Sequence, residues 1–303
     1  MPNTEAVRAP KLAFAVAVAA ACSASPAWGS ELIARNATDV RLEVNRAGTA
    51  LLSYRTRGKE HHVLAWGATN AAPSESERQQ VTFRLDYSGG WGAFRRPVWK
   101  SFANECEPAK PALAWLVTAC RAPDGSYWAV QSWQRTLPVY GMPALPGRDA
   151  WELRLSHWTG LAPKLEVQFG WTYRRFHQIF GRLTYRGLGV YGFSHTLRGV
   201  PLDDYGRNIY VDTLDSAYGP GWRRENGFLT HPPTGGFCYG FYPHGNRPSG
   251  RGVRYRATVI GPGVAPDAYW EGTPPSEYDR SFDLRADSHL LALLTGDPRC
   301  RPH

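Results

Sequence analysis

The chain has 303 residues, 43% of them hydrophobic and 20% charged, and it carries a formal net charge of +9 at pH 7. This composition excludes an intrinsically disordered protein, and the length suits one large β-rich domain with a substantial core. The positive charge favours anionic partners. The basic residues are scattered along the sequence, which argues against a nucleic-acid-binding protein.

Residues 1–29 have the three parts of a secretory signal peptide: a weakly basic start, the apolar run 12–21, and small residues up to Gly29. The apolar run is shorter than the roughly 20 residues of a transmembrane helix, and no later run is long enough. We expect cleavage after Gly29 and a mature chain, 30–303, that is secreted or associated with the cell envelope. Lipidation of Cys22 remains open as an alternative mode of attachment.

Short segments separated by turn residues come next in the chain. Turn signals at 45–48 and 57–59 predict a three-stranded meander within residues 31–69. The Pro, Ser and Glu residues of 70–79 predict an exposed linker between this meander and the main body.

Alternation of apolar and polar residues dominates the remainder of the chain, most clearly at 81–87, 151–155, 165–169 and 253–259. This period of two is typical of half-buried antiparallel strands. We expect the arginines on the polar side of these strands to form a solvated sheet surface. They are Arg84, Arg154, Arg254 and Arg256.

Two local signals complete the expected fold. Asp124-Gly125 lies between two apolar runs and predicts a β-hairpin. Residues 279–294 show helical periodicity, with Asp283 or Asp287 as the expected cap. We therefore predict an all-β single domain, an antiparallel β-sandwich or jelly-roll-like body, with one short C-terminal helix.

Four cysteines follow the expected cleavage site, and an even number in an exported chain predicts two disulfides. Three pairings are possible, of which we favour Cys106–Cys120 and Cys238–Cys300. The first closes a loop of about 15 residues and contributes roughly 3 kcal/mol in the chain-entropy model. The second would tie the C-terminus to the body. No C-x-x-C motif is present, which argues against zinc and thioredoxin-like chemistry.

Residues 195–231 form the densest polar stretch, with aromatic residues among acids, arginines and histidines. Aromatic rings stack on the apolar faces of sugars, while carboxylates and guanidinium groups bond to the hydroxyls. This pattern predicts a carbohydrate-binding surface. Its expected contact residues are Asp204, Tyr205, Trp222 and Arg223. The competing interpretation places these aromatic residues in the core.

Three other chemistries remain open for the same stretch. A glycoside hydrolase would need two carboxylates roughly 5–10 Å apart, for which Asp212 and Glu225 are the candidates, with His231 nearby. A cysteine nucleophile would use Cys238, although a disulfide is the simpler role for it. A calcium site would draw on loop carboxylates. Those carboxylates are Asp203, Asp204, Asp212 and Asp215.

Four strings in the mature chain carry a resemblance: YSGGW at 87–91, WELRLSHWTG at 151–160, YGRNIYVDT at 205–213 and FCYGFY at 237–242. With them the chain resembles a family of exported hypothetical proteins of GC-rich bacteria that has no assigned function. The resemblance covers most of the mature chain. It implies export and one family-wide body, and it transfers no catalytic or binding residue.

The function favoured by the sequence is therefore an exported binding module rather than an enzyme. Its expected partner is an anionic or carbohydrate polymer of the cell envelope, and we expect no nucleic acid, because the arginines are scattered, and no cofactor. The enzyme classes that depend on a G-x-S-x-G, H-E-x-x-H, P-loop or dinucleotide-binding motif lose support, because none of these motifs is present. A secreted hydrolase using paired carboxylates and a purely structural envelope protein are the alternatives.

Overall fold

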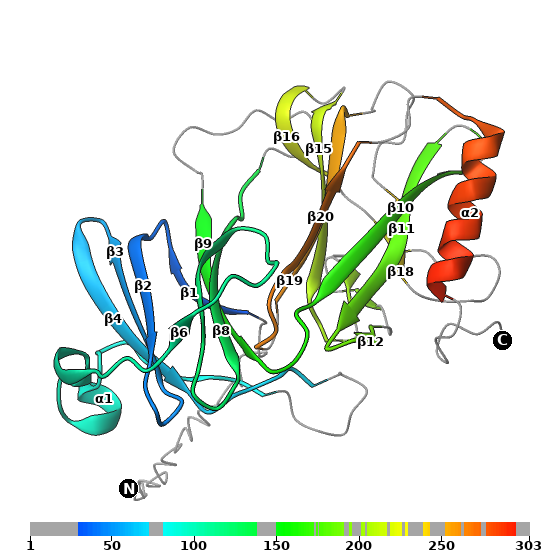
Figure 1. Ribbon diagram of the computed structural model, residues 1–303. Coiled ribbons are helices and arrows are strands. Elements are labelled where there is room, and N and C mark those ends of the chain that lie inside the picture. The colour runs from blue at the N-terminus through cyan, green and yellow to red at the C-terminus, as the bar shows by residue number, and fades with distance from the viewer. Residues whose placement is uncertain are drawn as a thin grey trace, which may run out of the picture.

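The structure is a computed structural model of the chain. It describes residues 30–72, 81–137, 150–172, 174, 176–190, 194–195, 201–203, 205–216, 219–225, 228–229, 239–242, 252–261, 264–273 and 277–294. These residues form four antiparallel sheets, arranged one after another, and a C-terminal helix at the end of the row (Figure 1). The predicted all-β, sandwich-like body with one short C-terminal helix is confirmed. The expected signal peptide and most of the expected linker lie outside the described residues.

The first sheet contains the strands of the predicted meander. Its strands are β2 (Thr38–Val44), β3 (Ala50–Thr56), β4 (Lys59–Trp66) and β5 (Arg84–Asp86). Gly48 and Gly58 adopt φ angles of 72° and 75° in the two tight turns, a conformation that glycine reaches without steric cost. The turn residues read from the sequence therefore set the order of these strands.

The second sheet is buried on both of its faces. In spatial order its strands are β1 (Glu31–Arg35), β9 (Trp151–Trp158), β8 (Tyr127–Gln134), β7 (Leu116–Arg121) and β6 (Glu107–Pro108). Trp128 and Val130 pack against the first sheet, whereas Ala129 between them packs in the core on the other side. Because β1 pairs with β9, the first strand of the chain belongs to the second sheet and not to the meander of the first sheet.

The third and fourth sheets both contribute side chains to the hydrophobic core that lies on the other side of the second sheet from the first sheet. The third contains β13 (Ser194–His195), β14 (Pro201–Leu202), β15 (Asn208–Ser216), β16 (Gly219–Glu225), β19 (Arg254–Ile260) and β20 (Ala268–Gly272). The fourth contains β10 (Lys164–Thr172), β11 (Phe176–Tyr185), β12 (Leu188–Gly189), β17 (Phe228–Leu229) and β18 (Tyr239–Tyr242). Phe169 of the fourth sheet meets Tyr255 of the third edge to face, with ring centroids 5.5 Å apart. Such aromatic pairs join the two layers.

Helix α2 (Arg280–Leu294) covers the outer face of the fourth sheet (Figure 1). Phe282 packs edge to face on Trp171, with ring centroids 5.1 Å apart. The expected cap at Asp283 or Asp287 is wrong, because Asp279 accepts hydrogen bonds from the backbone N–H groups of residues 281 and 282. A carboxylate just before the first helical residue is the usual N-cap arrangement.

The expected exposure of the strand arginines is wrong for two of the four. Arg84 and Arg254 are exposed, but Arg154 and Arg256 are buried in ion pairs. Alternation in a sequence predicts which residues share a face of a strand. It does not predict whether another sheet covers that face, and here the neighbouring layers cover both.

Three further features bear on the sequence predictions. The predicted Cys106–Cys120 disulfide is present, with Cα atoms 5.6 Å apart, whereas Cys238 and Cys300 lie outside the described residues. The helix α1 (Trp91–Phe94) and the 3₁₀ helix η1 (Val98–Ser101) were not expected from the sequence. In the parts of the chain that the structure describes, no helix is long and apolar enough to cross a membrane.

Candidate functional site

The acidic residue at the centre of the predicted hydrolase site is fully buried and already paired. Asp212 accepts hydrogen bonds from the Nε atoms of Arg224 and Arg256, at 2.8 and 2.7 Å. The guanidinium of Arg224 also lies 4.8 Å from the ring centre of Trp133 and 4.4 Å from that of Tyr210. Asp212 therefore neutralises two buried cations between the second and third sheets, and it has no open side for a substrate.

The strand register places the two residues of the hydrolase hypothesis in different cross-strand pairs. In the β15–β16 pair, Asp212 is opposite Arg224, and Glu225 is opposite Val211. The side chain of Glu225 and the whole of His231 lie outside the described part of the structure. The geometry brings Asp212 together with Arg224 and Arg256, and it brings no second acid to Asp212 from the described side chains.

The predicted sugar-contacting residues do not form an exposed row. Tyr205 is buried, with its ring centre 5.5 Å from that of Tyr185. Arg223 is buried as well, and its Nε donates to a backbone carbonyl in the same hairpin. Trp222 is half-buried, and the guanidinium of Arg256 lies 4.2 Å from its ring centre. Asp204 lies outside the described residues.

The acids of the calcium hypothesis also have other partners. Asp203 is buried and bonds to Nε of Arg207 at 2.8 Å. Asp215 is exposed and accepts the backbone N–H of Gly221 at 2.7 Å. Within the described segments, no three His, Cys, Asp or Glu side chains gather in a way that could hold a metal ion.

A different segment presents the exposed aromatic side chains. In the aromatic loop, which we define as residues 87–102, four rings are accessible: Tyr87 by 54%, Trp91 by 57%, Phe94 by 46% and Trp99 by 36%. The same loop exposes three basic residues, Arg95, Arg96 and Lys100. It contains α1 and lies at the edge of the first sheet, far from the C-terminal helix (Figure 1). Rings and cations thus share one accessible segment.

Two glycines allow the aromatic loop to turn tightly. Gly89 and Gly90 have φ angles of 66° and 115°, in the left-handed region. A Cβ atom on Gly89 would lie 2.6 Å from the Trp99 ring, and one on Gly90 would lie 2.6 Å from the carbonyl oxygen of Arg96. Only glycine fits both positions without a steric clash, so the conformation of the loop depends on these two residues.

A buried carboxylate holds the start of the aromatic loop. Asp86 accepts hydrogen bonds from the backbone N–H groups of Ser88 and Ala93, both at 2.8 Å, and from the Ser88 hydroxyl. Burial raises the pKa of Asp86, but these hydrogen bonds outweigh it and lower the pKa below its ordinary value. The loop is therefore fixed by an ionised acid whose oxygens point at its own backbone.

Two rings of the aromatic loop, those of Trp99 and Phe94, pack on aromatic side chains of the first sheet. Trp99 stacks on His62 of β4, with ring centroids 4.1 Å apart. Phe94 lies 5.6 Å from the ring of Trp66 on the same strand. The rings of Trp99 and Phe94 are thus held on one side by the sheet while part of their surface stays accessible. This arrangement limits the side-chain entropy that would be lost on binding.

Sequence reasoning missed this loop because it looked for aromatic residues only where acids and histidines are also dense, in residues 195–231. The signal was present in YSGGWGAFRRPVWK, residues 87–100, which carries four aromatic and three basic residues. Its three glycines and one proline prevent a long strand or helix, so its aromatic rings have no regular element to carry them into a core.

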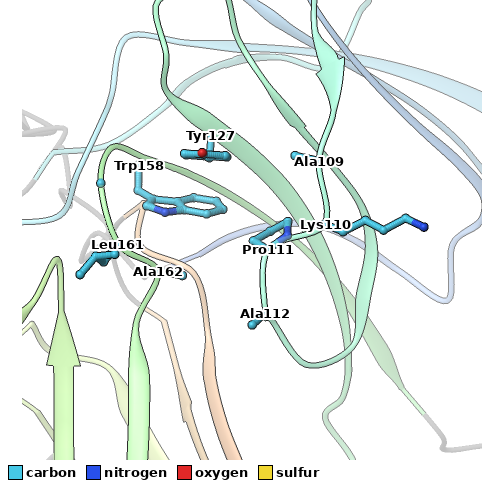
Figure 2. Close-up of a pocket in the computed structure, with 9 residues that line it drawn as sticks. Ala109, Lys110, Pro111, Ala112, Tyr127, Trp158, Leu161 and Ala162 are labelled. Atoms are coloured by element: carbon cyan, nitrogen blue, oxygen red, sulfur yellow. The ribbon is translucent and has the colours of Figure 1, made fainter.

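A shallow cleft of about 380 Å³ lies elsewhere, between the connection from β6 to β7 and the connection from β9 to β10 (Figure 2). Tyr127 and Trp158 stack in its wall, with ring centroids 5.5 Å apart, and Lys110 and Leu161 lie at its sides. Among the described residues that line this cleft there is no acid, histidine, serine or cysteine, and its only titratable side chains are those of Lys110 and Tyr127. Its size and its stacked rings suit a small apolar ring, and it brings together no pair of catalytic groups from the described residues.

Comparisons with known proteins complete the description of the candidate site. We compared the chain with protein-family models, with curated proteins and with solved structures, and none of the three comparisons gave a match.

Proposed function

We propose that this protein is an exported binding protein of the cell envelope and that its aromatic loop binds an acidic glycan polymer. One observation carries the proposal: four aromatic rings and three cations are exposed together on a loop fixed by Gly89, Gly90 and Asp86. Clustered exposed aromatic residues on a folded chain usually mark an interaction surface.

The two kinds of side chain suit the two chemical features of an acidic glycan. Sugar rings present apolar C–H faces, which pack on aromatic rings such as those of Trp91 and Phe94. Carboxylate or phosphate groups on the polymer pair with guanidinium groups such as those of Arg95 and Arg96, which bind oxyanions in a bidentate manner. Residues 84–102 carry four basic side chains against the single acid Asp86, so the local field attracts a polyanion.

The geometry supports binding over the hydrolase alternative. Asp212 bonds to two guanidinium groups in a buried layer and is therefore not free to protonate or attack a substrate. Among the described residues, no acid lines the cleft at Tyr127 and Trp158. The described residues thus supply recognition groups at the surface, and they supply no pair of free carboxylates.

Binding to polygalacturonate, a chain of carboxylated sugars, tests the proposal, with neutral dextran and anionic phosphatidylglycerol vesicles as comparison ligands. We expect the protein to bind polygalacturonate and Trp91→Ala to weaken that binding about tenfold, which corresponds to about 1.4 kcal/mol. Arg95→Gln combined with Arg96→Gln should weaken it as well and reduce its dependence on salt.

Trp151→Ala is the matched control, because Trp151 is 41% exposed but lies on β9, outside the aromatic loop. Equal losses of binding for Trp91→Ala and Trp151→Ala would contradict the assignment to the loop. Binding to the vesicles alone would replace the glycan with a membrane surface, for which aromatic and basic residues are also suited.

A further inference from the structure

The residue after the expected cleavage site is fixed inside the fold. Ser30 is only 1% exposed, and its hydroxyl donates a hydrogen bond of 2.6 Å to Oδ1 of Asp267. Its carbonyl oxygen accepts a hydrogen bond of 2.9 Å from Arg154. The next residue, Glu31, already pairs with Leu155 in the second sheet. The mature chain would therefore begin in a buried, hydrogen-bonded position.

Asp267 is a buried acid with one unused oxygen. Its Oδ1 accepts hydrogen bonds from Ser30 and from the backbone N–H of Gly261, but its Oδ2 has no hydrogen-bond partner among the described residues. Burial raises the pKa of Asp267, and Arg154 and Arg207 counteract this only from a distance. A buried carboxylate of this kind is costly unless a cation binds it directly.

Neighbouring buried acids each have such a cation. Glu152 bonds to the guanidinium of Arg154 at 2.7 Å, and Asp203 bonds to that of Arg207 at 2.8 Å. Across the described segments, no basic side chain lies within 4 Å of Asp267. Asp267 therefore lacks the one partner that comparable acids in this layer possess.

We infer that removal of residues 1–29 supplies this partner: the new α-ammonium group of Ser30 pairs with Oδ2 of Asp267. Hydrolysis adds one water across the Gly29–Ser30 bond, so that Gly29 leaves as a carboxylate and the Ser30 nitrogen becomes a protonated amine. Bond lengths within serine place that nitrogen within about 6 Å of the carboxylate whose Oδ1 already bonds to the Ser30 hydroxyl. The structure thus contains a binding site for its own processed N-terminus.

The inference rests on the export part of the proposed function and is independent of which polymer the loop binds.

Two chains that lack the expected signal peptide test the pairing. Both keep every residue that the structure describes, because those residues lie within 30–294. One chain begins at Ser30. The control begins at Gly29 and carries the same charges, but its ammonium group lies one residue, about 3.8 Å, further along the chain. We expect the Ser30 chain to melt several degrees higher at pH 7, and we expect Asp267→Asn to remove this difference. Equal melting temperatures, or a difference that survives Asp267→Asn, would overturn the inference.

Reaction of the terminal amine with an acylating reagent under native conditions gives a second readout that does not require Asp267→Asn to fold. The Ser30 amine should react at least tenfold more slowly than the Gly29 amine, and equal rates would contradict the pairing. The mass of the full chain after export from a bacterial host separates the two proposals. An exported chain that begins at Ser30 supports both the export proposal and the pairing of Ser30 with Asp267. An exported chain that begins at another residue overturns only the pairing. Failure of export contradicts the export proposal, on which the pairing rests.

Discussion

Two regions of this molecule are rich in both aromatic and charged residues, and they use them in opposite ways. In residues 203–225, Asp203 and Asp212 are buried and paired with arginines, and the described aromatic side chains are buried or half-buried. In the aromatic loop, residues 87–102, the rings and cations are exposed. The difference shows that composition alone does not identify a binding surface, because a covering layer can convert the same residue types into a buried network.

The arrangement of the sheets explains this contrast. Strand β15 lies inside the third sheet, with β19 on one side and β14 and β16 on the other, so its polar side chains face another layer. Each buried charge there needs a partner, and Asp212 has two. The aromatic loop follows the short edge strand β5, beyond which no described strand continues the sheet. Its basic residues are therefore left without a covering layer.

The largest effect should come from breaking the buried network. Asp212→Ala leaves Arg224 and Arg256 buried without their shared acid, which should lower the free energy of unfolding by about 3–5 kcal/mol. Denaturant unfolding measures this change. Asp215→Asn is the control, since Asp215 lies on the same strand but is exposed, and it should change the stability by less than about 0.5 kcal/mol. Similar effects for both variants would contradict the contrast between network and surface.

A smaller effect should follow from loosening the aromatic loop at Asp86. Asp86→Ala removes the acceptor of two backbone N–H groups and should cost about 2 kcal/mol, with faster amide exchange at Ala93 and weaker polymer binding. Glu105→Ala, an exposed acid just after the loop, is the control. Unchanged exchange at Ala93 would show that Asp86 does not hold the loop.

The same carboxylate gives the loop a defined response to pH. Burial alone would raise the pKa of Asp86, but its hydrogen bonds lower the pKa in the folded state below the ordinary value of 3.8. An acid with a lowered pKa stabilises the fold above that ordinary value, and this contribution is lost as the pH falls through the folded pKa. Protection of the Ala93 N–H, taken as the intrinsic exchange rate at each pH divided by the measured rate, should therefore decrease below about pH 4 in the native chain, and it should not show this step in Asp86→Ala.

Two local signals in the sequence predicted local structure correctly, although the predicted helix cap at Asp283 or Asp287 was wrong. Asp124-Gly125 forms the turn between β7 and β8, and Cys106 and Cys120 form the predicted disulfide. Burial was not predictable in the same way, since it depends on which sheets face one another. Arg154 and Arg256 alternate with apolar residues as a solvated face would, yet both are buried under a neighbouring layer. Long-range packing of this kind leaves no periodic signal in one strand.

The candidate site follows the same rule. The sequence directed attention to 195–231 because acids and aromatic residues are dense there, but such density is equally typical of a paired interior network. The aromatic loop could have been recognised from its glycines, which exclude its rings from regular strands. A search for aromatic residues between turn-forming residues would have found it, whereas a search for aromatic residues dense among acids led to residues 195–231.

The smallest changes in stability are expected for two tryptophan variants, one in each region, and their difference compares the two regions directly. Trp222→Ala removes a half-buried ring that packs under the guanidinium of Arg256, and it should lower the free energy of unfolding by about 1–2 kcal/mol. Trp91→Ala removes a ring of the same size that is mostly exposed, and it should change the stability by less than about 0.5 kcal/mol. Denaturant unfolding of both variants gives the comparison. Equal losses would mean that Trp91 is a packing residue, and its effect on polymer binding would then reflect a disturbed fold. A stable Trp91→Ala chain that binds polymer poorly would assign the ring to recognition, because no loss of folding could account for the loss of binding.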